Sequence, residues 1–149
     1  MSVGSTPVRP ERRQRTTQLI AELQSERQEV WSLYCKIAEL KPFTDIDPVR
    51  VKLTRFSEML VDYVSLGHFG LYERILSGTE RRDRILSVAT ELYPEFSEVT
   101  ELSVNFNDKY EKVDDIAAFN TLVDDLSELG ESLAKRFELE DRLCELMQR

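Results

Sequence analysis

The chain has 149 residues, of which 41% are hydrophobic and 32% are charged, and it contains only five glycines. These proportions are typical of soluble helical proteins and not of disordered or membrane proteins. No apolar run approaches the roughly 18 residues that a membrane span needs, and the N-terminus lacks the apolar stretch of a signal peptide. We therefore expect a cytoplasmic protein with no membrane association and one hydrophobic core.

Charge is distributed unevenly along the chain. Residues 1–15 hold four arginines against one glutamate, a net charge of +3, so the remaining residues carry −11 of the total of −8. An acidic body is repelled by the phosphates of nucleic acids and attracted to basic protein surfaces. We expect no direct binding of nucleic acid; the acidic surface serves either solubility or a basic protein partner.

The N-terminal part of the sequence predicts a tail followed by a helix. Residues 1–14 contain prolines and arginines without apolar periodicity, which predicts a flexible basic tail and a single domain over residues 15–149. A helix is predicted from an N-cap at Thr16 or Thr17 to Lys41-Pro42. Its apolar stripe, which Glu26 interrupts, consists of Leu19, Leu23, Val30, Leu33 and Ile37.

A second, unusually long helix is predicted from Asp47 as N-cap and Pro48 as first helical residue to about Ser77. Two glycines inside it, Gly67 and Gly70, weaken a helix by about 1 kcal/mol each relative to alanine. Their presence indicates a bend, a close approach by another element, or room for a partner. Gly67 lies on the packing stripe, which favours a close helix crossing there.

The second helix has two distinct faces when its residues are spaced at 100° intervals. The inner, packing face is formed by Val49, Leu53, Phe56, Leu60, Tyr63, Gly67 and Leu71. The nearly opposite, outer face is formed by Asp62, Ser65, Phe69 and Tyr72. The sequence leaves open whether Phe69 and Tyr72 are exposed to a partner or covered by the first helix. His68 lies at the flank of the inner face and is predicted to be a hydrogen-bonded packing residue.

Two further helices complete the chain. The third begins after Thr79, and because its apolar phase continues through Pro94, the proline predicts a kink and not a break. The fourth begins after Asp114 or Asp115. Their apolar positions are Ile85, Ala89, Leu92, Phe96, Val99, Phe106 and Tyr110 in the third, and Ile116, Phe119, Val123, Leu126, Gly130, Leu133 and Phe137 in the fourth. With no competing strand pattern, we expect an all-α fold, an antiparallel four-helix bundle kinked at Pro94.

Catalytic patterns are scarce. The chain has one histidine and no GxSxG, Walker or HExxH motif, so we expect that it is not an enzyme. Cys35 and Cys144 are isolated within predicted helices, which favours reduced packing residues over a disulfide.

A metal-binding alternative comes from residues 68–73, HFGLYE, which resemble the HFxxEE helix motif of hemerythrin-like di-iron bundles; residues 136–141, RFELED, are similar. One histidine cannot supply a di-iron site, so we expect no metal and no cofactor. A carboxylate site at Glu140 or Asp141, or another small-ligand site in a hemerythrin-like bundle, remains the alternative.

The second helix also carries a family resemblance. Residues 62–69, DYVSLGHF, followed by residues 72–76, YERIL, resemble the signature of the Rsd/AlgQ family of bacterial anti-sigma regulators. Upstream of Arg27, the chain departs from the family, which commonly has a tryptophan-bearing turn there. Further landmarks occur in the family's order: ERQEV at residues 26–30, Lys41-Pro42, Tyr93-Pro94, and LGESLAKRFELEDRL at residues 129–143.

The resemblance implies a four-helix bundle that binds region 4 of the primary sigma factor, the basic helix-turn-helix domain that reads the promoter −35 element. Binding would block access of region 4 to core RNA polymerase and promoter DNA, as a 1:1 complex with a monomer. The family match implies that Asp62, Ser65 and Phe69 bind the partner and that Tyr72 extends the contact. AlgQ-like relatives are also associated with virulence. A regulatory adaptor for a protein other than sigma is the remaining alternative.

Overall fold

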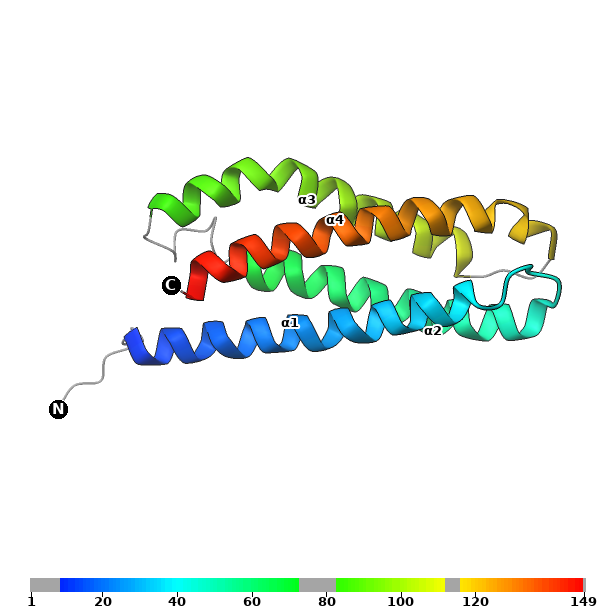
Figure 1. The fold of residues 1–149 in the computed structure, drawn as a ribbon, viewed down its shortest axis with the longest axis horizontal. Helices are drawn as coiled ribbons and strands as arrows, with labels where there is room; N and C mark the ends of the chain where they lie inside the picture. The colour runs from blue at the N-terminus through cyan, green and yellow to red at the C-terminus, as the bar shows by residue number, and fades with distance from the viewer. Residues whose placement is uncertain (1–8, 73–82, 112–115, 149) are drawn as a thin grey trace.

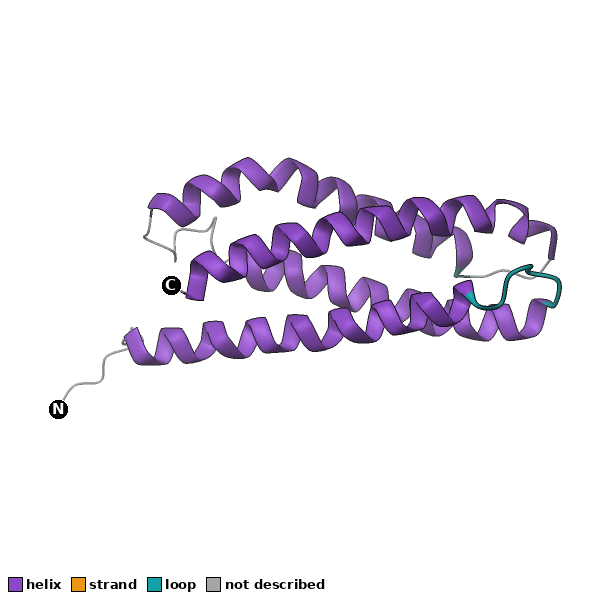
Figure 2. Ribbon diagram, viewed as in Figure 1, coloured by secondary structure: helices purple, strands orange, loops and turns teal. Residues whose placement is uncertain are grey.

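The computed structural model describes residues 9–72, 83–111 and 116–148, and within these ranges the protein is helical without any strand (Figure 2). The elements are α1 (Arg9–Ala38), α2 (Ile46–Ser65), the π-helix η1 (Leu66–Tyr72), α3 (Asp83–Tyr110), the 3₁₀-helix η3 (Ile116–Thr121) and α4 (Leu122–Gln148). None of the helices in these ranges is long and apolar enough to cross a membrane.

The four long helices lie side by side along the long axis of the molecule (Figure 1). α1 packs against α2, α2 against α3, α3 against α4, and α4 against α1. All four contribute to one core, in which aromatic rings meet edge to face; the rings of Phe56 and Phe106, for example, are 5.9 Å apart. The apolar periodicity of the sequence therefore corresponds to a single buried interior.

The first helix begins earlier than the sequence analysis predicted. α1 starts at Arg9, so residues 9–14, which we assigned to a flexible tail, are helical, and Thr16 is not an N-cap. The arginines and Glu11 in this stretch are good helix formers, and Pro10 is tolerated in a first helical turn because its missing N–H would have no intrahelical partner there. Residues 1–8 lie outside the described part of the chain.

The second helix also differs at both ends. Its N-cap is Asp45 and not Asp47, which instead lies in the first turn, where a carboxylate is stabilised by the helix dipole. The α-helix ends at Ser65 and continues as a π-helix through Tyr72. The predicted stop at Gly78 and restart after Thr79 lie outside the described residues.

The third helix runs through Pro94 from Asp83 to Tyr110, as its continuous apolar phase predicted. Each of its predicted apolar positions is buried. The packing stripe of the fourth helix was predicted less well: Val123 is 43% exposed and Phe137 is only half-buried. For Val123 the cause is η3, in which residues three apart are eclipsed, so that Leu122 follows Phe119 into the core. At Phe137, the neighbouring Arg136 occupies the buried position.

The two cysteines have different environments, which corrects one expectation. Cys144 is buried and burial raises its pKa to about 12, whereas Cys35 is exposed and does not pack in the core. Both are free.

We expect iodoacetamide at pH 8 to alkylate Cys35 and leave Cys144 unmodified, because alkylation requires an accessible thiolate. Intact mass spectrometry should show one adduct on the folded chain and two in denaturant. Two rapid adducts without denaturant would contradict the burial of Cys144.

Candidate functional site

The predicted outer face lies at the junction of α2 and η1. The side chain of Phe69 is 62% exposed, the most exposed aromatic ring among the described residues, so α1 does not cover it. Asp62 is exposed and Ser65 is half-buried beside it. The side chain of Tyr72 lies outside the described part of the structure, so its predicted contribution stays a prediction. The described face therefore combines a carboxylate, a hydroxyl and an apolar ring.

The two glycines of η1 are explained by what lies against them. A Cβ on Gly67 would be 2.6 Å from Nη2 of Arg136 and 3.2 Å from Oε1 of Glu140, both side chains of α4. A Cβ on Gly70 would be 3.0 Å from a methyl group of Leu19 in α1. The predicted close approach thus occurs at both positions, made by side chains of neighbouring helices and not by a crossing backbone. η1 is held between α1 and α4.

His68 packs beside the exposed ring. Its imidazole is half-buried, meets the ring of Phe69 edge to face at 5.0 Å, and lies 6.1 Å from the ring of Tyr93. Its Nδ1 is enclosed and has no hydrogen-bond partner among the described residues, contrary to the expectation of a hydrogen-bonded histidine. The imidazole thus packs against the ring of Phe69.

An acidic group on α1 adjoins Asp62, and the sequence analysis missed it. Burial, followed by the charges of Glu22, Asp62 and Glu29, raises the pKa of Glu26. One carboxylate oxygen of Glu26 is enclosed without a hydrogen-bond partner in the described structure. We read Glu26 only as an interruption of an apolar stripe; the three- and four-residue spacing of the glutamates was the available signal. The face is therefore more acidic than Asp62 alone would make it.

Behind this face lies a buried polar network in the core. Arg136 is fully buried, and its Nε donates to Oε1 of Glu140 at 3.1 Å. Its other nitrogens donate to Thr100 Oγ1 at 2.7 Å and to the carbonyl of Val64 at 3.1 Å. The guanidinium also stacks on Phe96 at 3.9 Å. The cation thus donates to three acceptors and has an aromatic ring over its face.

The Glu140 carboxylate also accepts a hydrogen bond from a residue of α2. The Tyr63 hydroxyl donates to its Oε2 at 2.5 Å, and burial together with that carboxylate raises the pKa of Tyr63 far above its ordinary range. The neighbouring Asp141 pairs with Arg27 at 2.8 Å. The two carboxylates considered for a metal site thus have arginine partners, and the described residues contain no group of three or more potential metal ligands.

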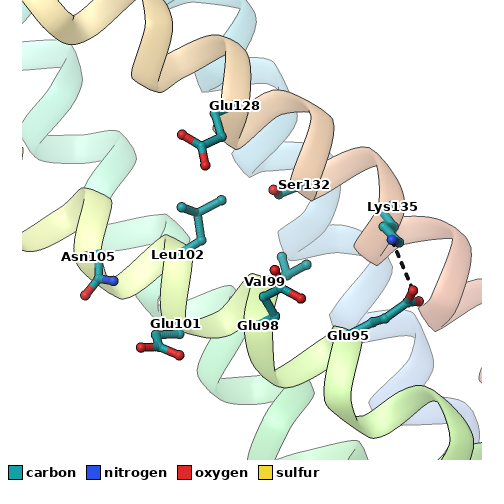
Figure 3. Close-up of a pocket in the computed structure, with 9 residues that line it drawn as sticks. All are labelled: Glu95, Glu98, Val99, Glu101, Leu102, Asn105, Glu128, Ser132 and Lys135. Atoms are coloured by element: carbon teal, nitrogen blue, oxygen red, sulfur yellow. Dashed lines mark ion pairs between the residues drawn. The ribbon is translucent and has the colours of Figure 1, made fainter.

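Two concave regions lie elsewhere on the bundle. A hollow of about 300 Å³ between α3 and α4 has Val99 and Leu102 in its lining and several glutamates around them (Figure 3). Its one cation, Lys135, pairs with Glu95 at 3.1 Å. A second hollow of about 400 Å³ lies between α1 and α4 beside Trp31. Neither includes a residue of the predicted outer face.

Comparison with known proteins identifies the family. The profile described as "Regulator of RNA polymerase sigma(70) subunit, Rsd/AlgQ" matches residues 5–148. The chain belongs to the Rsd/AlgQ family. It is similar to the "Regulator of sigma D" of Yersinia enterocolitica, with 32% identity over 87% of this chain and 80% of that protein. The counterpart in Yersinia pseudotuberculosis is 31% identical over 87% and 79% of the two chains.

A third relative of the same name, from an Enterobacter species, is 40% identical over 63% of this chain and 57% of its own length. No solved structure matches the chain. The Rsd/AlgQ membership places this protein among regulators of a sigma factor, which is not an enzyme family.

The environment of Glu26 generates a stability prediction. Because its pKa is raised in the folded state, the folded protein binds protons more readily than the unfolded chain, and the charged carboxylate destabilises the fold above that pKa. We expect Glu26→Gln to raise the melting temperature at pH 7 by about 2 °C, and the gain to shrink as the pH falls toward 4.5. Thermal unfolding followed by circular dichroism measures both.

Glu91→Gln is the matched control, because Glu91 is exposed on α3 and should leave the melting temperature unchanged. An equal gain in both variants would show that total charge, and not the site of Glu26, is responsible.

Proposed function

We propose that this protein is a cytoplasmic anti-sigma regulator that binds region 4 of the primary sigma factor through the face of Asp62, Ser65 and Phe69. Binding there would keep region 4 from core polymerase and from the −35 element. The single observation that carries the site is the ring of Phe69, 62% exposed in a member of a sigma-regulator family. A large apolar ring held in water is a candidate anchor for a partner.

The charge of the face fits a DNA-reading partner. Region 4 is a helix-turn-helix domain, and such surfaces carry Arg and Lys that meet phosphate oxygens. The carboxylates of Glu22, Glu26 and Asp62 lie close together across α1 and α2, where they would take the place of phosphates, and Glu29 beside them pairs with Arg55 at 3.3 Å. Complementary charges orient the two proteins as they meet and increase their association rate. The same acidity is the reason we propose no direct binding of nucleic acid.

Each residue of the face has a distinct proposed role. Phe69 inserts into an apolar pocket of the partner, and Asp62 accepts a charged hydrogen bond from a basic side chain. Ser65, small and half-buried, permits close approach and offers a hydroxyl. We propose that Tyr72 extends the apolar contact.

The framework for this face is, we propose, an antiparallel bundle that acts as a monomer in a 1:1 complex. The short connection between α1 and α2 and the packing of consecutive helices against each other support this arrangement. We further propose that α3 bends at Pro94, because a proline inside a helix removes one backbone hydrogen bond and crowds the preceding turn.

The face predicts which substitutions weaken binding. We expect Phe69→Ala to weaken the affinity for isolated sigma region 4 by about 30-fold, as loss of an apolar anchor costs about 2 kcal/mol. Asp62→Ala should weaken it by about 5-fold, with a smaller effect at high salt because the lost interaction is ionic. Isothermal titration calorimetry at two salt concentrations measures both.

Matched controls lie on the same helix. Val51→Ala removes another strongly exposed apolar side chain, and Asp47→Ala another exposed carboxylate, both well before the proposed face. Neither should change the affinity. Unchanged binding by folded Phe69→Ala and Asp62→Ala would refute the site, and no binding by the unmodified chain would refute the function.

A further inference from the structure

The exposed ring of Phe69 stands on a short π-helix, and a π-helix needs support that an ordinary helix does not. Its hydrogen bonds run from residue i to i+5, so the ladder of i to i+4 bonds changes where α2 becomes η1. A buried carbonyl near such a transition is stabilised by an additional donor from another element. The carbonyl of Val64, two residues before η1, has such a donor in Nη2 of Arg136 at 3.1 Å.

Arg136 also lies against the first turn of η1 itself. The absent Cβ of Gly67 would be 2.6 Å from the same Nη2, so the guanidinium is pressed directly onto the π-helix backbone. The position of the guanidinium is fixed by Glu140 at 3.1 Å and by Thr100 at 2.7 Å. On the other side of η1, Leu19 of α1 packs onto Gly70. The segment that presents Phe69 is thus held from two sides.

We propose that Arg136 is a positioning residue for the protein-binding face. Although buried and unable to touch a partner, it holds the junction of α2 and η1 through the Val64 carbonyl and the surface of Gly67, and so fixes the direction of Phe69 and Ser65. This inference rests on the proposed binding of region 4. It differs from a general stabilising role, because it requires a local effect on η1.

The test uses a double variant that removes the cation without leaving its partner's charge buried. Arg136→Met with Glu140→Gln keeps side-chain volume and an acceptor for the Tyr63 hydroxyl, and replacement of a buried ion pair by groups of similar volume is often tolerated. Thr100 keeps its own hydrogen bond to the Phe96 carbonyl. The donor to Val64 is lost.

Two measurements are made on the full chain. We expect the double variant to bind isolated sigma region 4 at least about tenfold more weakly than the unmodified protein by calorimetry. Hydrogen exchange followed by mass spectrometry should show faster exchange in residues 66–72 and unchanged exchange in residues 103–110, the end of α3 beyond the contacts of Arg136 with Phe96 and Thr100. Faster exchange throughout the bundle would indicate a general loss of stability and would overturn the proposal, as would unchanged affinity.

Ser103→Ala is the matched control, because it removes a buried hydroxyl of α3 whose hydrogen bond, to the carbonyl of Val99, does not involve Arg136. Its affinity should remain within about twofold of the unmodified protein. If the double variant does not fold, Gly67→Ala replaces it: the added methyl displaces Arg136 Nη2 from a buried site that no partner reaches. Binding by folded Gly67→Ala equal to that of the unmodified chain would overturn the proposal.

The two proposals fail in different ways. If the unmodified chain does not bind region 4, the proposed function is wrong, while exchange in residues 66–72 still decides whether Arg136 holds η1. If the unmodified chain binds but the double variant binds equally well, the function stands and the positioning role is wrong.

Discussion

The ion pair of Arg136 and Glu140 is the constraint around which the described structure is arranged. Both side chains are buried, and a buried charge is costly unless a partner and further hydrogen bonds satisfy it. The surroundings meet that condition: Tyr63 from α2 donates to the carboxylate, and Thr100 and the ring of Phe96 from α3 receive the guanidinium. Three helices must therefore be in register for the pair to be satisfied, so the pair favours one packing over its alternatives.

The pair also shapes the surface. Glycine at position 67 leaves room for the guanidinium, which an added Cβ would displace, and the π-helix places its backbone at that contact. On the outward side of the same segment stands Phe69, and the half-buried Glu26 of α1 lies among other carboxylates close to Asp62 of α2. Features that lower stability, namely an exposed ring, repelling charges and a helix irregularity, occur together. Such features are expected where function and not folding selects the residues.

Some elements of this site followed from the sequence and others could not. The inner and outer faces of the second helix were predictable, because Phe56 and Tyr63 repeat at helical spacing and Phe69 does not share their phase. The acidic group could have been predicted from the sequence, because Glu22, Glu26 and Glu29 share one face of α1. The side chain that contacts Gly67 could not be predicted, because a glycine in a helix indicates that another group approaches closely but does not identify that group. In the sequence, Arg136 is only the first residue of RFELED, the segment similar to a metal motif, and its neighbours on α2 and α3 show why an arginine is buried there.

The sequence by itself determined the helical class, the single core and the family, because apolar periodicity and ordered motifs are local properties that survive without coordinates. It did not determine where α1 begins, how η3 turns α4 so that Val123 faces outward, or that α2 ends in a π-helix. The π-helix is the outcome that involves contacts between residues far apart in the chain: Gly70 against Leu19, and the Val64 carbonyl against Arg136. Only the tertiary structure brings these residues together, because they lie on α1 and α4, and a buried backbone that departs from the α-helix is stabilised by such partners.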